Sequence, residues 1–246
     1  MPASPQPRLP DAVLWDMDGT LVDTEPLWNE AQRELVADHG GTWTQQLAES
    51  LVGQALDVGA RRLQAAGVDL PVERIIDVTI SHVIQAVRRA VPWRPGALEL
   101  LQDQAAAGVP GALVTMSHAP LARVLAEHAP AGSLRIVVSG DEVTRGKPDP
   151  EAYRLGLSRL RQLRPDLSPQ RCAAVEDSPV GVAAATAAGL PTAAVPSVLE
   201  LDPDAGTVQW DTLAGRGLAD LADVVAAHGS MATPPRRDPR TGDGAR

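Results

Sequence analysis

Two aspartates, Asp16 and Asp18, follow a short apolar run and are the residues of this chain best suited to chemistry. An apolar run of that length (residues 12–15), bounded by turn-forming residues, predicts a buried strand. The carboxylates would then lie at its carboxyl end, where open α/β sheets bind ligands. One aspartate could attack phosphorus and form an acyl phosphate. The other could serve as acid and base for the leaving group and the attacking water.

Two plainer interpretations of this segment need to be weighed. A calcium-binding loop places its glycine at the sixth position and a bidentate glutamate at the twelfth. Here Gly19 is the fourth residue counted from Asp16, so the calcium loop is excluded. Taken alone, the segment could still be a simple turn, and that alternative stays open until other parts of the chain are considered.

Three later segments carry polar residues that could complete a phosphate site. Thr115 ends an apolar run, Lys147 lies between a glycine and a proline, and Asp177 follows a further apolar run. With the first segment, they resemble the four motifs of the haloacid dehalogenase-like (HAD) hydrolase superfamily. The resemblance is strongest to its small phosphatases and its β-phosphoglucomutase-like proteins with a helical cap. The segments that carry the resemblance, in the family's order, are residues 16–25, 114–117, 146–150 and 175–178.

This resemblance implies a fold and an activity. The fold is a Rossmann-like parallel sheet in a three-layer α/β/α core, with an inserted α-helical cap. The activity is that of a Mg²⁺-dependent phosphatase, which hydrolyses a small phosphomonoester such as a sugar phosphate through an aspartyl phosphate. Two alternatives remain, namely a phosphosugar mutase of the β-phosphoglucomutase type and a non-catalytic binding or regulatory relative.

The resemblance also assigns roles to single residues. It makes Asp16 the nucleophile and Asp18 the acid and base. The metal would be held by the carboxylates of Asp16 and Asp177 and by the backbone carbonyl of Asp18, with Glu176 in indirect contact. Mg²⁺ favours such oxygen ligands. The expected substrate-binding residues are Thr115, Met116, Ser117, Lys147 and Gly53, of which Thr115 and Lys147 also count as catalytic.

Several of these residues have ordinary interpretations when taken one at a time. Thr115 could merely cap a strand end, and Lys147 could be a solvated lysine. The order of the motifs favours the functional role for both. His118 is better explained as a loop or helix-start residue than as a base, since Asp16 and Asp18 leave no vacant role. Asp149 is expected to orient its loop or to cap the following helix.

The region expected to form the cap departs from the mutase pattern. Mutases of the β-phosphoglucomutase type carry an arginine that grips the second phosphate, and its place is taken here by Leu56. They also carry a histidine, whose place is taken by Trp28. Arg61 and Arg62 could substitute, although a solvated helix face explains them more simply. These departures favour a phosphatase.

Composition limits the class of protein further. The 246 residues are 44% apolar and carry a net charge of −9, which disfavours non-specific binding to nucleic acid. The single cysteine, Cys172, excludes an internal disulfide and is expected in the core. No apolar run is long enough to span a membrane, so a soluble, cytoplasmic protein is expected. We expect a small phosphorylated metabolite as its partner, and a monomer or homodimer.

Hydrophobic patterns divide the chain into a core and an insertion. Residues 1–10 are expected to form a flexible arm and residues 229–246 a disordered tail. The core would comprise 11–23 and 92–228, and a helical cap would comprise 24–91. Strands are expected at 12–16, 111–115, 135–139, 172–176 and 192–195. Helices are expected at 25–39, 45–51, 56–66, 72–89, 97–107, 121–128, 150–163 and 180–188.

Overall fold

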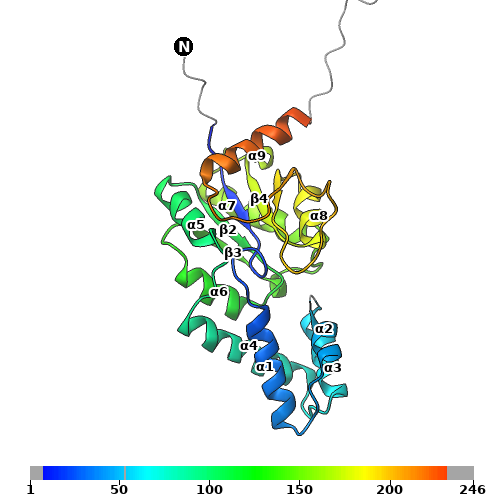
Figure 1. Ribbon diagram of the computed structural model, residues 1–246. Coiled ribbons are helices and arrows are strands. Elements are labelled where there is room, and N and C mark those ends of the chain that lie inside the picture. The colour runs from blue at the N-terminus through cyan, green and yellow to red at the C-terminus, as the bar shows by residue number, and fades with distance from the viewer. Residues whose placement is uncertain (1–7, 53, 232–246) are drawn as a thin grey trace, which may run out of the picture.

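The computed structural model describes residues 8–52 and 54–231, and this part of the chain contains one six-stranded parallel sheet. The strand order is β3-β2-β1-β4-β5-β6, with β1 near the middle (Figure 1). The strands are β1 (Val13–Trp15), β2 (Gly111–Val114), β3 (Leu134–Val138), β4 (Ala173–Glu176), β5 (Thr192–Ala194) and β6 (Val208–Gln209). The predicted α/β class with a parallel sheet is confirmed.

The sheet is covered by helices on both faces, as its first strand shows most directly. Val13 and Trp15 belong to one hydrophobic cluster, whereas Leu14 between them belongs to a second. Side chains alternate between the faces of a strand, so the two clusters lie on opposite faces of the sheet. Helices α5 (Ala97–Ala106), α6 (Ala119–His128) and α9 (Leu218–Met231) contribute to the first cluster, and helices α7 (Glu151–Leu163) and α8 (Pro179–Ala187) to the second. This is the expected three-layer core.

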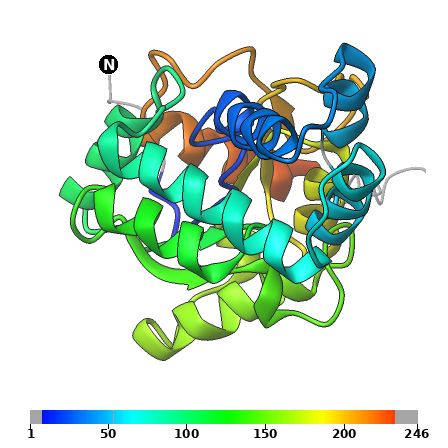
Figure 2. The same cartoon turned by 90° about the horizontal axis from the view of Figure 1, so that it is seen from below.

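Within the described residues, five helices lie between β1 and β2 in the chain, and the first four form an insertion beyond the end of the sheet at which β1 leads into α1 (Figure 1). They are α1 (Glu25–Asp38), α2 (Gln45–Leu51), α3 (Leu56–Ala65) and α4 (Val72–Arg89). They share a small hydrophobic cluster of their own, which includes Val36, Leu63 and Ile75. Ala31 and Val83 belong instead to the same cluster as Trp15, and α4 lies beside α6 (Figure 2). The insertion is therefore packed against the core.

Two elements at the C-terminal side were not predicted. The strand β6 has only two residues, too few to show an alternating pattern. The helix α9 continues to Met231, where Ser230 Oγ donates to Ala226 O at 3.2 Å, so the expected disordered tail is wrong for residues 229–231. The predicted flexible arm, residues 1–10, extends too far, because Pro10 is buried and Arg171 donates a hydrogen bond to Leu9 O. The remaining parts of the arm and the tail, residues 1–7 and 232–246, lie outside the described residues.

Cys172 is a core residue, as expected. Its side chain is fully buried, and Sγ lies 3.2 Å from Ser168 O. Burial raises the pKa of this thiol to about 12, and the charge of Asp11 adds to the effect. Because the thiolate is the reactive form of cysteine, Cys172 has no role as a nucleophile.

Candidate active site

The carboxyl ends of three neighbouring strands bring the predicted residues together. Trp15 pairs with Leu113 of β2 on one side and with Val175 of β4 on the other. Asp16 follows β1, and its backbone N donates to Val175 O at 3.1 Å. Thr115 follows β2, while Glu176 ends β4 and Asp177 follows it. In-register pairing thus places these residues at one edge of the sheet.

Lys147, the only lysine in the chain, is buried at the centre of this edge. Its side chain is 3% exposed, and Nζ donates to Asp16 Oδ1 and to Glu176 Oε1 at 2.6 Å each. A third donation reaches Val114 O at 2.9 Å, so all three N–H groups of the ammonium are used. Burial alone would lower the pKa of Lys147, but the charges of Asp16 and Glu176 outweigh it and raise the pKa. The ammonium therefore stays charged beside Asp16.

The second carboxylate oxygen of Asp16, Oδ2, is buried and has no hydrogen-bond partner among the described residues. Carboxylate oxygens of Asp16, Glu176 and Asp177 lie within 4.8 Å of one another. Burial, and then the charge of Asp16, raises the pKa of both Glu176 and Asp177. Three acids with one ammonium leave the cluster short of positive charge, and an unpartnered carboxylate oxygen points to a missing cation. The donor set is all oxygen, which fits Mg²⁺.

Asp18 lies beside this cluster but has its own partners. Its Oδ2 accepts hydrogen bonds from Ser117 Oγ at 2.7 Å and from Thr115 Oγ1 at 3.3 Å, and its Oδ1 accepts from Thr24 Oγ1 at 2.5 Å. Burial and the charge of Asp16 raise the pKa of Asp18 against the lowering effect of these hydrogen bonds. A carboxyl that is protonated more readily than usual suits a general acid.

The contact from Thr24 was not predicted. Thr24 is the N-cap residue of α1, yet its side chain makes no capping hydrogen bond in that helix and binds Asp18 instead. The residue at which the chain enters the first inserted helix is therefore hydrogen-bonded directly to Asp18.

The loop after Asp16 is held by another residue that the sequence did not single out. The guanidinium of Arg94 donates to Gly19 O, to Val195 O at 3.4 Å and to Pro196 O at 3.2 Å. It joins the loop after β1 to the loop after β5. Arg94 follows the insertion, where the chain returns to the core, so this contact also fixes that return.

The two other predicted loops contact each other through Met116. Lys147 N donates to Met116 Sδ at 3.3 Å, and Ser117 N donates to Thr115 Oγ1 at 2.9 Å. Asp149 precedes the N-cap residue Pro150, and its Oδ1 accepts a hydrogen bond from Glu151 N, the first residue of α7, at 3.0 Å. His118 precedes α6 and is not a hydrogen-bond partner of Asp18, which agrees with its interpretation as a helix-start residue.

Tyr153 of α7 also belongs to the site, although no motif pointed to it. Its side chain is fully buried, and Oη donates to Glu176 Oε1 at 2.5 Å. Burial and the negative charge of Glu176 raise the pKa of this phenol well above its ordinary value. A tyrosine on the buried face of a helix needs a partner for its hydroxyl, which was the available signal.

The residues considered in the expected cap have the following places. Gly53 lies outside the described residues. Leu56 and Trp28 pack against the hydrophobic cluster that contains Trp15. Arg61 pairs with Asp57 on the surface, at 3.2 Å, and Arg62 donates to Ser50 O.

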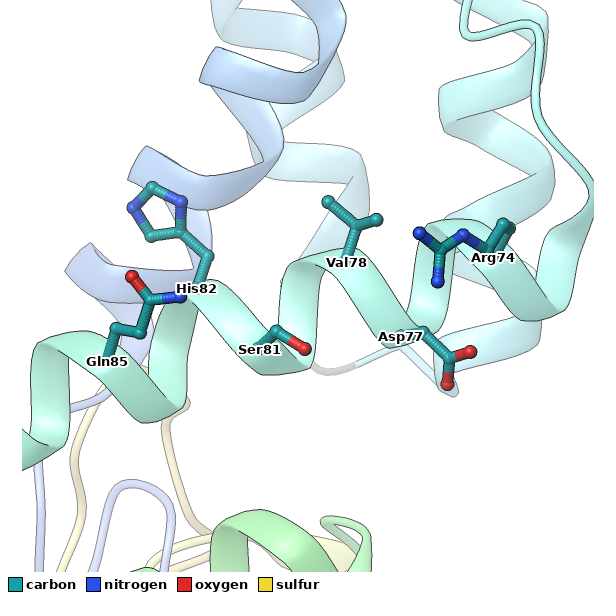
Figure 3. A pocket seen from close by; sticks show the side chains of 6 residues that line it. All are labelled: Arg74, Asp77, Val78, Ser81, His82 and Gln85. Atoms are coloured by element: carbon teal, nitrogen blue, oxygen red, sulfur yellow. The ribbon is translucent and has the colours of Figure 1, made fainter.

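A separate hollow of the surface lies along α4 (Figure 3). All its lining residues come from that helix, and none belongs to the group around Asp16. They are Arg74, Asp77, Val78, Ser81, His82 and Gln85. This hollow is not the site that the motifs define.

A parallel sheet with an acidic cluster at its carboxyl edge is a suitable arrangement for a hydrolase that acts on a phosphate ester. A family model described as haloacid dehalogenase-like hydrolase matches residues 10–189. The chain therefore belongs to the haloacid dehalogenase-like hydrolase family, as its motifs predicted.

Proteins of known name or structure agree with this assignment. The chain is 33% identical to hexitol phosphatase A of Escherichia coli over 74% of its own length and 81% of the relative's. It is 32% identical to the phosphorylated carbohydrates phosphatase of Thermotoga maritima, over 73% of the chain and 82% of the relative. A crystal structure of a CbbY mutant from Rhodobacter sphaeroides with xylulose-(1,5)bisphosphate is 27% identical, with a TM-score of 0.74 over 87% of this chain and 99% of that one.

Proposed function

We propose that the protein is a Mg²⁺-dependent phosphatase that hydrolyses a small phosphorylated carbohydrate through an aspartyl phosphate on Asp16. The observation that carries the proposal is the state of the Asp16 carboxylate. One of its oxygens is bound to the buried ammonium of Lys147, and the other has no hydrogen-bond partner within residues 8–52 and 54–231. This carboxylate, paired with an ammonium, follows the end of a strand, where a phosphate can approach it.

The Asp16 and Asp177 carboxylates and the Asp18 backbone carbonyl would hold the metal. When bound, Mg²⁺ offsets negative charge on the carboxylates and on the phosphate oxygens. Glu176 is the less available ligand, because its Oε1 already accepts hydrogen bonds from Lys147 and Tyr153. We propose that Glu176 acts mainly by holding Lys147.

In the first step, an Asp16 carboxylate oxygen bonds to phosphorus while the bond from phosphorus to the ester oxygen breaks. Asp18 donates its proton to that oxygen, and the alcohol leaves. In the second step, Asp18 takes a proton from water while the water oxygen bonds to phosphorus. The bond from phosphorus to the Asp16 carboxylate oxygen breaks, so the free carboxylate is restored and inorganic phosphate is released. The charge of Lys147 offsets that of the phosphate oxygens during both steps, and the hydroxyl groups of Thr115 and Ser117, with the backbone of Met116, bind these oxygens.

We propose that residues 24–91 act as a cap on a core formed by 11–23 and 92–228. The carbohydrate class of substrate is supported by the names of the relatives, hexitol phosphatase A and a phosphorylated carbohydrates phosphatase. None of the described helices has the length and low polarity needed to cross a membrane. We propose a cytoplasmic enzyme, a monomer or homodimer, that acts on free metabolites and not on nucleic acid.

The test is release of inorganic phosphate from p-nitrophenyl phosphate and from a panel of hexose and hexitol phosphates, with and without Mg²⁺. We expect turnover of at least one substrate, dependence on Mg²⁺, and no turnover by Asp16→Asn, because an amide cannot form the acyl phosphate. Asp57→Asn, a change at an exposed aspartate on α3, is the control and should keep full activity. Turnover by a verified Asp16→Asn preparation would refute the proposal.

A mutase is disfavoured because Leu56 and Trp28 cannot grip a second phosphate and because Arg61 and Arg62 have other partners. The protein should therefore convert little β-glucose 1-phosphate to glucose 6-phosphate when the bisphosphate activator is supplied. The decisive quantity is the ratio of isomerised sugar to free phosphate. A ratio above one would favour the mutase.

A further inference from the structure

The single lysine and the single tyrosine of this chain bind the same carboxylate oxygen. Glu176 Oε1 accepts from Lys147 Nζ at 2.6 Å and from Tyr153 Oη at 2.5 Å. All three side chains are buried, with exposed fractions of 3% for Lys147 and 0% for Glu176 and Tyr153. The chain contains no phenylalanine and one tyrosine, so aromatic rings of this kind are not a general feature of its core.

The three partners of Lys147 place it under competing attractions. Nζ is bound by Asp16, by Glu176 and by the Val114 carbonyl, and it also lies 5.2 Å from the centre of the Tyr153 ring. Movement of the Glu176 carboxylate would carry the ammonium with it, away from Asp16. The orientation of Glu176 therefore decides where Lys147 points.

Tyr153 is well placed to fix that orientation. It projects from the first turns of α7, and its ring packs in the cluster that contains Leu14 and Val114, so the hydroxyl has little freedom. A hydroxyl donates to Glu176 without adding charge, and the charge of Lys147 remains available to Asp16. A hydrogen bond to a buried carboxylate is among the stronger ones. The other Glu176 oxygen, Oε2, accepts a long hydrogen bond of 3.5 Å from Ser178 Oγ and no other from the residues that the structure describes, so it constrains the carboxylate less.

We infer that Tyr153 is a positioning residue, which acts through Glu176 to hold Lys147 against the nucleophile Asp16. This inference rests on the proposed phosphatase function. Tyr153 touches neither the phosphate nor the metal in this scheme. Its loss should therefore slow chemistry and leave the affinity for substrate nearly unchanged.

The first experiment compares Tyr153→Phe, which removes only the hydroxyl, with wild type on p-nitrophenyl phosphate. We expect kcat to fall about tenfold and KM to stay within about a factor of two. The control is Thr192→Val, which removes a fully buried hydroxyl from β5, outside the site, and should leave both constants unchanged. An unchanged kcat in Tyr153→Phe would overturn the inference. A wild-type protein with no turnover on any substrate would instead refute the proposed function.

The second experiment separates positioning from packing. If Tyr153 acts through Glu176, then Tyr153→Phe should have no further effect on kcat in a Glu176→Gln background. A tenfold loss in both backgrounds would show that the hydroxyl acts independently of Glu176, and it would overturn the inference.

The third readout does not need activity. Biosynthetic replacement of tyrosine by 3-fluorotyrosine should give one ¹⁹F resonance, because the chain has one tyrosine. That resonance should shift in Lys147→Met and stay in place in Thr192→Val. An unchanged resonance in Lys147→Met would show that the contacts among these residues do not exist in solution.

Discussion

Gly19 lies directly against Asp177, because a Cβ added to this glycine would be 2.0 Å from Asp177 Oδ2. The glycine also has a φ of +86°, a conformation that residues with side chains rarely adopt. The backbone of the turn that follows Asp16 and Asp18 thus lies against the Asp177 carboxylate, which we propose as a metal ligand. Any side chain at this position must displace Asp177.

Gly19→Ala should therefore weaken the response to Mg²⁺. The control is Gly189→Ala, since Gly189 has a φ of +79° but nothing within 4 Å of an added Cβ. Both changes should lower the free energy of unfolding by about 1–2 kcal/mol. Only Gly19→Ala should raise the Mg²⁺ concentration needed for half-maximal activity. Equal Mg²⁺ curves for the two variants would contradict the prediction.

Lys147→Met should abolish activity and destabilise the fold. It leaves the buried carboxylates of Asp16 and Glu176 without their cation, and breaking a buried pair in this way costs about 3 kcal/mol or more. Because protonation removes the unpaired charge, the loss of stability should be smaller in mild acid than at neutral pH. Chemical denaturation at both pH values checks this. A variant as stable as wild type at neutral pH would contradict the assigned ion pairs.

Asp18→Asn should reveal the need for a general acid. An alkyl phosphate needs a proton on its leaving oxygen, whereas p-nitrophenolate leaves readily without one. In a single turnover, the variant should therefore lose far more activity on a hexose phosphate than on p-nitrophenyl phosphate. Rapid-quench measurement of the first turnover separates this step from the later attack of water. Equal losses on the two substrates would exclude Asp18 as the acid.

The metal-free protein should become less stable as the pH rises. Burial and the charge of Asp16 raise the pKa of Asp177 to about 8 and that of Glu176 to about 7. The folded state then holds protons that the unfolded chain has released, so the free energy of unfolding falls from about pH 5 to about pH 8. Mg²⁺ should reduce this slope by taking the place of the protons. Melting curves across this range, in EDTA and in Mg²⁺, measure both effects, and a rising apo stability would contradict them.

The sequence was most informative where side chains follow strand ends. Asp16, Thr115 and Glu176 were expected at one edge of a parallel sheet, and they meet there because β1 pairs with both β2 and β4. The helix α9 was missed although Leu218, Leu221, Val224 and Val225 carry a helical period, so that signal was available.

Contacts between side chains that are distant in sequence were not available in the same way. Nothing in a motif shows that Tyr153 donates to Glu176, or that Arg94 joins Gly19 to Pro196. Such contacts depend on how helices and loops dock, which local patterns do not fix. Thr24 illustrates the limit, since its position suggested a helix cap while its hydroxyl binds Asp18.

Because the chain has one lysine, chemical labelling of that residue can report how often the site becomes exposed to solvent. Lys147 supplies the only side-chain amine of the chain, and that amine is 3% exposed with every N–H group bonded. An acylating reagent can modify it only when Nζ leaves its three hydrogen-bond partners and becomes exposed. The rate of labelling at this residue therefore reports transient opening of the site. Mass spectrometry of the labelled peptide would measure these openings at this one residue, without any engineered probe.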